Sequence, residues 1–133
     1  MTSNVWESSI ECAGRAVAVD LWFDGAPPDA AAKDRVARFT TEADEFDRAA
    51  RRAIREDPVL REYLEHHVDD LGEEPSDEDA FLRRLHLVRI GLYPGEPDRC
   101  ACFDYTTGRD VTDCVVAVRF DARGAIAGLA MES

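Results

Sequence analysis

Residues 101–132 read ACFDYTTGRDVTDCVVAVRFDARGAIAGLAME. They contain three short runs of apolar and β-branched side chains, with turns at Gly108 and Gly124 between them. Short runs separated by glycine turns are typical of an antiparallel meander. A sheet with one apolar face must bury that face against another element. This stretch therefore predicts three antiparallel strands that need a helical cover.

The N-terminal part predicts a β-hairpin over residues 5–24, with its turn at Gly14. From residue 16 to residue 23, every second side chain is a large apolar one, which is the period-two pattern of a half-buried strand. The inward set is Val17, Val19, Leu21 and Phe23, and the outward set is Ala16, Ala18, Asp20 and Trp22. An outward-facing Trp22 is a candidate dimer contact. Residues 85–93 predict one more strand.

The middle of the chain predicts helices. Apolar residues recur at steps of three and four from Ala32 to Ile54, and their phase continues across Thr40-Thr41. We therefore predict one long amphipathic helix over residues 29–56, which the two threonines could kink. Asp57-Pro58 predicts the start of a second helix that ends at Gly72. Ser76, followed by Asp79, predicts a short third helix.

The predicted order is two strands, two or three helices, then four strands. This order indicates a single α+β domain spanning residues 1–133. We predict a two-layer sandwich, in which a mainly antiparallel sheet of about six strands is covered on one face by helices. The N-terminal hairpin and a C-terminal four-stranded meander supply the strands. A chain of 133 residues can bury such a core without disulfides or a metal.

The chain is strongly acidic, with 28 acidic and 16 basic side chains and a net charge of -12. Such a surface repels nucleic-acid phosphates and anionic lipid, so neither is an expected partner. A basic protein surface is the partner that this charge favours. The alternative is that the acidity only keeps the protein soluble.

Features that direct proteins to membranes or export are missing from the sequence. No apolar run is long enough to span a bilayer, and the first ten residues lack the basic and apolar regions of a secretion signal. The arginine and alanine bias is typical of a GC-rich bacterial genome. We therefore predict a bacterial cytoplasmic protein with reduced cysteines.

One segment concentrates the negative charge. Residues 69–79 contain seven acidic side chains and no basic one. The candidate acidic patch consists of Asp69, Asp70, Glu73, Glu74, Asp77, Glu78 and Asp79. It is either a solvated connector between helices or a surface for a basic partner.

A second candidate site is the loop that follows Asp104. Asp104, Tyr105, Asp110 and Asp113 form this candidate interaction loop. Close carboxylates bind calcium or act as an acid/base pair, but the spacing does not match an EF-hand. The alternative is that these aspartates cap turns through hydrogen bonds to the backbone.

The cysteines form a third candidate set. Residues two apart on a strand share a face, so Cys100 and Cys102 could approach one metal ion together with Cys114 and His86. The CxxC spacing of structural zinc sites is absent, and buried free cysteines commonly pack as small apolar residues. No serine elbow or glycine-rich phosphate loop occurs in the sequence. We therefore predict no cofactor, no metal and no catalytic residue.

Several motifs resemble a small bacterial family catalogued only as a domain of unknown function. They are IGLY at 90–93, FDYTTGRDVTD at 103–113, FDxxG at 120–124 and MES at 131–133. VDLWFD at 19–24 also fits, so the resemblance covers nearly the whole chain. In that family an aromatic residue follows Asp113, where this chain has Cys114. The resemblance implies a compact α/β two-layer protein and carries no catalytic residues. At the level of class only, the chain is also similar to acidic immunity proteins, which block toxins.

Two functional hypotheses follow. The first is a non-enzymatic protein-binding module, specifically an immunity-like inhibitor of a basic toxin domain. The second is a small enzyme or metal-binding protein that uses the Asp104/Asp110/Asp113 loop or the Cys100/Cys102/Cys114 set. Both are compatible with a monomer or a homodimer.

Overall fold

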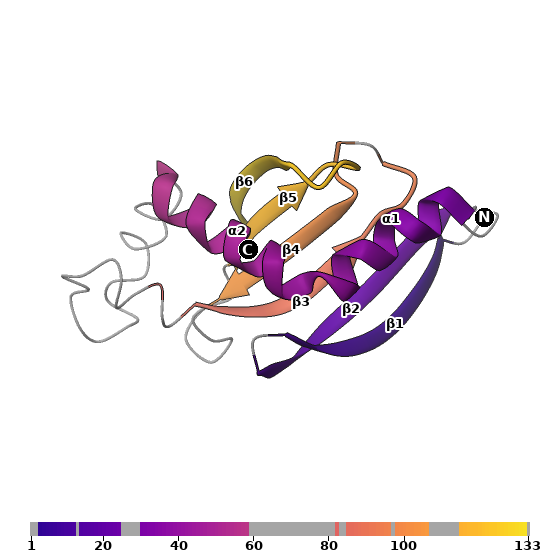
Figure 1. The fold of residues 1–133 in the computed structure, drawn as a ribbon, viewed down its shortest axis with the longest axis horizontal. Helices are drawn as coiled ribbons and strands as arrows, with labels where there is room; N and C mark the ends of the chain where they lie inside the picture. The colour runs from indigo at the N-terminus through magenta and orange to yellow at the C-terminus, as the bar shows by residue number, and fades with distance from the viewer. Residues whose placement is uncertain are drawn as a thin grey trace.

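The computed structural model describes residues 3–12, 14–24, 30–58, 82, 85–96, 98–106 and 115–132. The chain is a mixed α+β protein with six strands and two helices in these ranges (Figure 1). In chain order the elements are β1 (Ser3–Cys12), β2 (Arg15–Asp24), α1 (Ala30–Thr41), α2 (Ala43–Glu56), β3 (His86–Leu92), β4 (Ala101–Thr106), β5 (Val115–Phe120) and β6 (Ile126–Glu132). No helix in the described ranges is long and apolar enough to cross a membrane.

All six strands form one sheet whose spatial order equals the chain order. β1 and β2 form the predicted antiparallel hairpin, and β3 to β6 form the predicted four-stranded meander. β2 and β3 pair in parallel, because the chain between them crosses back over the sheet and that segment contains the helices. The sheet is therefore mixed, with one parallel junction between two antiparallel units.

The single long helix predicted over residues 29–56 is not confirmed, because the structure has two helices that meet at Glu42. The hydroxyls of Thr40 and Thr41 both donate to the carbonyl oxygen of Ala37, at 2.9 and 3.0 Å. Such side-chain bonds compete with the helical backbone pattern and bend helices. Glu42 has a φ of -109° and a ψ of 25°, outside the helical range. The two threonines therefore mark the break.

The helices lie against one face of the sheet (Figure 1), and their apolar side chains share one core with the strands. Val17 and Val19 are buried as predicted, and Leu21 is partly buried. Four phenylalanines join the helices to the sheet: Phe39 from α1, Phe46 from α2, Phe103 from β4 and Phe120 from β5. Their ring centroids are 4.7 to 6.3 Å apart in five contacting pairs.

The two hairpin turns predicted at Gly14 and Gly124 are confirmed, with φ values of 79° and 87°. L-residues rarely adopt such positive φ values, so glycine fits both places. Gly124 is also crowded, since a Cβ there would lie 3.1 Å from an Arg38 nitrogen and 3.2 Å from the Phe46 ring. The turn at Gly108 and the helices expected between Pro58 and residue 82 lie outside the described residues.

The substitution Gly124→Ala tests how far this turn depends on glycine. We expect a loss of about 1–2 kcal/mol in the free energy of unfolding, because a Cβ at positive φ is strained and would displace Phe46. Gly95→Ala is the matched control, since nothing lies within 4 Å of its Cβ position. Urea denaturation measures the free energy of unfolding of both variants. Equal losses in the two would contradict the dependence of this turn on glycine.

Candidate functional site

Asp104 and Tyr105, expected in a loop, lie in strand β4 and point to opposite faces of the sheet. Tyr105 is fully buried in the core between sheet and helices. Asp104 lies on the other face, where it accepts hydrogen bonds from Arg89 and Cys102. Asp110 and Asp113 lie outside the described residues. The strand period of two thus separates the first two residues of the predicted cluster.

Tyr105 belongs to a buried polar network. Its hydroxyl donates to Asp47 Oδ1 at 2.7 Å, and Arg51 Nε donates to both oxygens of the same carboxylate at 3.1 and 3.2 Å. Arg51 also donates to the backbone carbonyl of Leu85 at 3.0 Å and lies 5.3 Å from the Tyr105 ring centroid. Asp47 is only 4% exposed, so these bonds replace the water that its charge has lost. The network ties α2 to β4 and to the start of β3.

Burial and the neighbouring Asp47 charge raise the pKa of Tyr105 far above its ordinary value. The phenol therefore remains protonated and acts as a hydrogen-bond donor. Its role here is structural.

The candidate acidic patch of residues 69–79 lies entirely outside the described residues. It comprises Asp69, Asp70, Glu73, Glu74, Asp77, Glu78 and Asp79.

Cys100 and Cys102 do not share a face as the metal hypothesis required. Cys100 precedes β4 and packs in the hydrophobic core, whereas Cys102 lies beside Asp104 with a sulfur–oxygen distance of 3.4 Å. Cys114 lies outside the described residues.

His86, the fourth candidate ligand, contacts Arg15 through Nδ1 at 3.1 Å, and its pKa is lowered by burial and then by the Arg15 charge. Within the described ranges no group of three His, Cys, Asp or Glu side chains can hold a metal.

The face of the sheet opposite the helices, here called the outer face, carries an ion network that the sequence analysis missed. Arg89 on β3 donates to Asp20 on β2 and, at 3.2 Å, to Asp104 on β4. Burial raises the pKa of Asp104, and the bonds from Cys102 and Arg89 oppose that rise. The sequence could not reveal this network without knowledge of which strands pair. Asp20 and Arg89 are 69 residues apart, and the parallel β2–β3 junction brings them together.

An aromatic pair extends this network along the outer face. Trp22 stacks on Tyr93 with ring centroids 6.5 Å apart and an interplanar angle of 16°. Arg99 lies 4.6 Å from the centroid of the Tyr93 ring. Gly91 leaves room for this arrangement, since a Cβ there would come within 2.9 Å of the Tyr93 hydroxyl. Trp22 remains 37% exposed, as its alternating position predicted.

The outward-facing side chains of the hairpin form a continuous strip that we call the hairpin surface. It consists of Glu7, Ser9 and Glu11 on β1 and of Ala16, Ala18, Asp20 and Trp22 on β2. Glu7 lies directly opposite Asp20 in the register, and Asp20 is also the acceptor of the ion pair from Arg89 on β3. None of these positions holds a basic residue. The strip combines carboxylates, small side chains and one exposed tryptophan.

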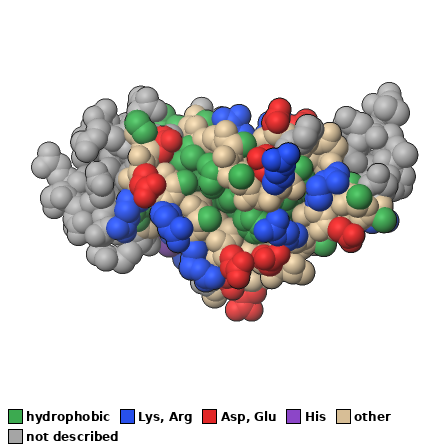
Figure 2. Space-filling view, turned by 45° about the horizontal axis from the view of Figure 1, so that its top comes forward, with side chains coloured by type: hydrophobic (Ala, Val, Ile, Leu, Met, Phe, Trp, Pro, Cys, Tyr) green, Lys and Arg blue, Asp and Glu red, His purple; other side chains and the backbone are tan. Residues whose placement is uncertain are grey.

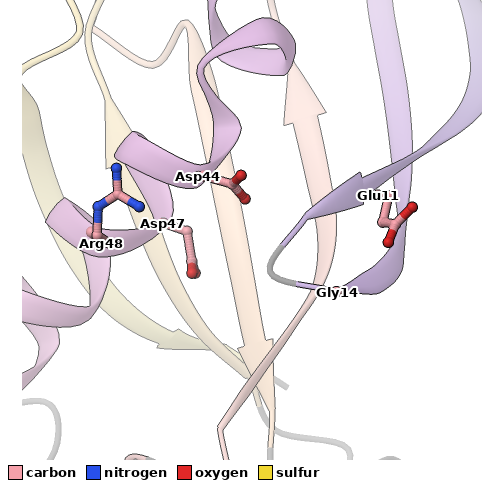
Figure 3. A pocket seen from close by; sticks show the side chains of 5 residues that line it. All are labelled: Glu11, Gly14, Asp44, Asp47 and Arg48. Atoms are coloured by element: carbon pink, nitrogen blue, oxygen red, sulfur yellow. The ribbon is translucent and has the colours of Figure 1, made fainter.

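An open cleft of about 500 Å³ lies beside the hairpin turn. In Figure 3 it lies between α2, which carries Asp44, Asp47 and Arg48, and the hairpin, which carries Glu11 at the end of β1 and Gly14 in the turn. Asp47 is already bonded to Tyr105 and Arg51, so Asp44, Glu11 and Arg48 set the charge of the cleft. Burial, followed by a hydrogen bond to Asp44 and the Asp47 charge, raises the pKa of the nearby Cys12 thiol to about 12. The acidic character of the hairpin surface thus continues around the turn.

Comparisons of this chain with family models, curated proteins and solved structures find no match. The resemblance drawn from the motifs at 90–93 and 103–113 stays a prediction.

Removal of the Tyr105 hydroxyl tests the buried network. Tyr105→Phe leaves Asp47 with one donor fewer, so we expect a loss of about 1–3 kcal/mol in the free energy of unfolding. Tyr93→Phe is the control, because its hydroxyl lies 3.5 Å from Arg89 at a half-buried site. Calorimetry of both variants measures the difference, and a loss in the control as large as in Tyr105→Phe would contradict the structure.

Alkaline pH tests the buried thiols. Burial raises the pKa of Cys12 and Cys102 from 9.0 to about 12, so the folded state keeps protons that the unfolded state loses. Stability is then lost as pH rises from about 9 towards 12, by up to about 1.4 kcal/mol per pH unit for each thiol. Urea denaturation between pH 7 and pH 10.5 measures this slope. Cys102→Ala should reduce it, and an unchanged slope would argue against a buried thiol there.

Proposed function

We propose that this chain is a non-enzymatic protein-binding module whose partner is basic, and that the hairpin surface contacts that partner. The observation that carries the proposal is the exposed Trp22, stacked on Tyr93 and followed along the same face by Asp20 and Glu7. Tryptophan, tyrosine and arginine dominate the energetics of protein interfaces. Here such residues stand on a sheet, where their positions are set before a partner binds.

The chemistry of the hairpin surface favours cations. A basic side chain that docks there gains the carboxylate of Glu7, which lies opposite the Asp20 that is already paired with Arg89. The Trp22 ring adds a face for a guanidinium or an ammonium group. The overall charge of -12 attracts the same partner from a distance, and salt screens that attraction.

The proposed architecture leaves this surface accessible. The helices form one layer of a two-layer sandwich and the sheet forms the other, so the outer face of the sheet is available to a partner. Within this class, an immunity-like inhibitor of a basic toxin domain in the bacterial cytoplasm is the specific form that we propose. The acidic patch of residues 69–79 would add long-range attraction to the same partner.

The alternative of an enzyme or metal-binding protein has less support. Cys102 is a poor nucleophile, because burial and Asp104 raise its thiol pKa to about 12. The Tyr105 hydroxyl and the Asp47 carboxylate are hydrogen-bonded to each other in the core. These observations favour binding over the Asp104/Asp110/Asp113 or Cys100/Cys102/Cys114 chemistry.

The test is affinity capture from the host bacterium followed by titration of the purified partner. We expect a basic protein whose affinity falls about tenfold or more with Trp22→Ala, because Trp22 is the aromatic anchor. We expect Glu7→Gln to slow association and to flatten its salt dependence. Glu56→Gln, the same change at the end of α2, is the matched control and should have no effect. An acidic partner, or one that binds the Trp22→Ala variant with full affinity, would overturn the proposal.

A further inference from the structure

Strand β6 (Ile126–Glu132) forms the other edge of the sheet. Among the described strands it pairs only with β5. Its sequence IAGLAME carries no charge before Glu132 and contains no proline. Natural proteins usually protect an edge strand with lysine, proline or a covering element, since its free N–H and C=O groups can pair with another strand. Ile126 at the start of β6 is 38% exposed.

Leu129 and Met131 lie on the helix side of β6 and are only partly covered. Both pack against the core, yet both remain of intermediate exposure. Figure 2, which turns the top of Figure 1 towards the viewer, shows hydrophobic side chains gathered between charged ones on this side of the molecule. An added strand next to β6 would cover these two side chains.

Arg119 on β5 has a polar atom without a partner. Its Nε is buried and makes no hydrogen bond among the described residues. The guanidinium lies over Gly128 of β6, with Arg119 nitrogens 3.6 and 3.9 Å from the Cβ position of that glycine. A buried donor without a partner destabilises the folded chain, so the site fits an added carboxylate. Glu132 of the same chain is four residues from Gly128, about 13 Å along the strand.

We propose that the chain forms a symmetric homodimer in which β6 pairs antiparallel with β6 of a second copy, centred on Ala130. A two-fold interface must be self-complementary, and this register is. Leu129 lies opposite Met131 of the second copy on the helix side. Gly128 lies opposite Glu132 of the second copy on the outer side. Glu132 of the second copy then reaches Arg119 of the first copy, which lies over Gly128. By symmetry, Glu132 of the first copy reaches Arg119 of the second.

The register also explains why the contact is limited to 128–132. A shift in pairing lies between Arg119 and Phe120 of β5, opposite Ile126 and Gly128. Such bulges bend a strand and end regular pairing. The dimer joins two sheets into one through a strand whose one charge, Glu132, is paired with Arg119 of the other copy, so this strand adds no unpaired charge to two copies of charge -12. It leaves the two hairpin surfaces at the far edges, so the proposed partner site remains accessible in each copy.

Sedimentation equilibrium of the wild type at 10–200 µM in about 150 mM salt tests the dimer. We expect a dimer for the wild type and at least a tenfold weaker dimer for Glu132→Arg, which would place Arg opposite Arg119. The equimolar mixture of Glu132→Arg with Arg119→Glu should associate again, because both ion pairs are restored in that heterodimer. Glu56→Arg is the matched control and should dimerise like the wild type. A monomeric wild type at 200 µM overturns the proposal.

A cysteine at the two-fold axis tests the register without a change of charge. In Ala130→Cys the two introduced side chains lie directly opposite each other, with Cβ atoms about 4.5–5.5 Å apart, which a disulfide can bridge after a small adjustment. We expect rapid covalent dimerisation under mild oxidation, compared with the wild type under the same oxidant. Ala125→Cys lies outside the paired segment and should crosslink slowly. Equal crosslinking of the two variants overturns the proposed register.

Discussion

The structure depends on the four phenylalanines that join both helices to the centre of the sheet. Phe39 and Phe46 come from the two sides of the break at Glu42, and they contact Phe103 and Phe120 on neighbouring strands. Because rings from both helices meet in one cluster, the break does not separate the helices from each other or from the sheet. Aromatic pairs add about 0.5–1.5 kcal/mol each beyond the area they bury. The Asp47–Tyr105–Arg51 network adds a second connection between α2 and β4.

The side chains of β4 point alternately into the core under the helices and towards the outer face of the sheet. Phe103 and Tyr105 face the helices, while Cys102 and Asp104 face outwards. The outer side holds the Asp20–Arg89–Asp104 network, a half-buried ion chain that ties β2, β3 and β4 across the parallel junction. Half-buried charges of this kind stabilise little by themselves, but they fix the register at the one place where the two antiparallel units meet. The hairpin surface depends on that register, because the junction brings Trp22 against Tyr93.

The two edges of the sheet differ in chemistry, and this difference links the two proposals. β1 and β2 present carboxylates and a tryptophan, whereas β6 carries no charge before Glu132 and has the unbonded Arg119 Nε beside it. The first edge suits a basic partner and the second suits a copy of the same chain. A dimer through β6 would therefore present two hairpin surfaces, and two linked sites increase the apparent affinity for a partner that itself has two sites.

The sequence by itself determined the elements and the inward faces. The alternation in 16–22 and the glycines at 14 and 124 predicted the strand, the burial of Val17 and Val19 and the turns correctly, because these follow from local backbone geometry. The sequence marked Thr40-Thr41 as the place where the helix could kink but predicted one helix, since the apolar phase continues through this point; the hydroxyl bonds of Thr40 and Thr41 accompany the break at Glu42. The tertiary structure alone decided which distant residues meet. The parallel β2–β3 junction brings Asp20 to Arg89, and the contact between Asp47 and Tyr105 joins α2 to β4, because strand pairing and helix–sheet packing act between residues far apart in the chain.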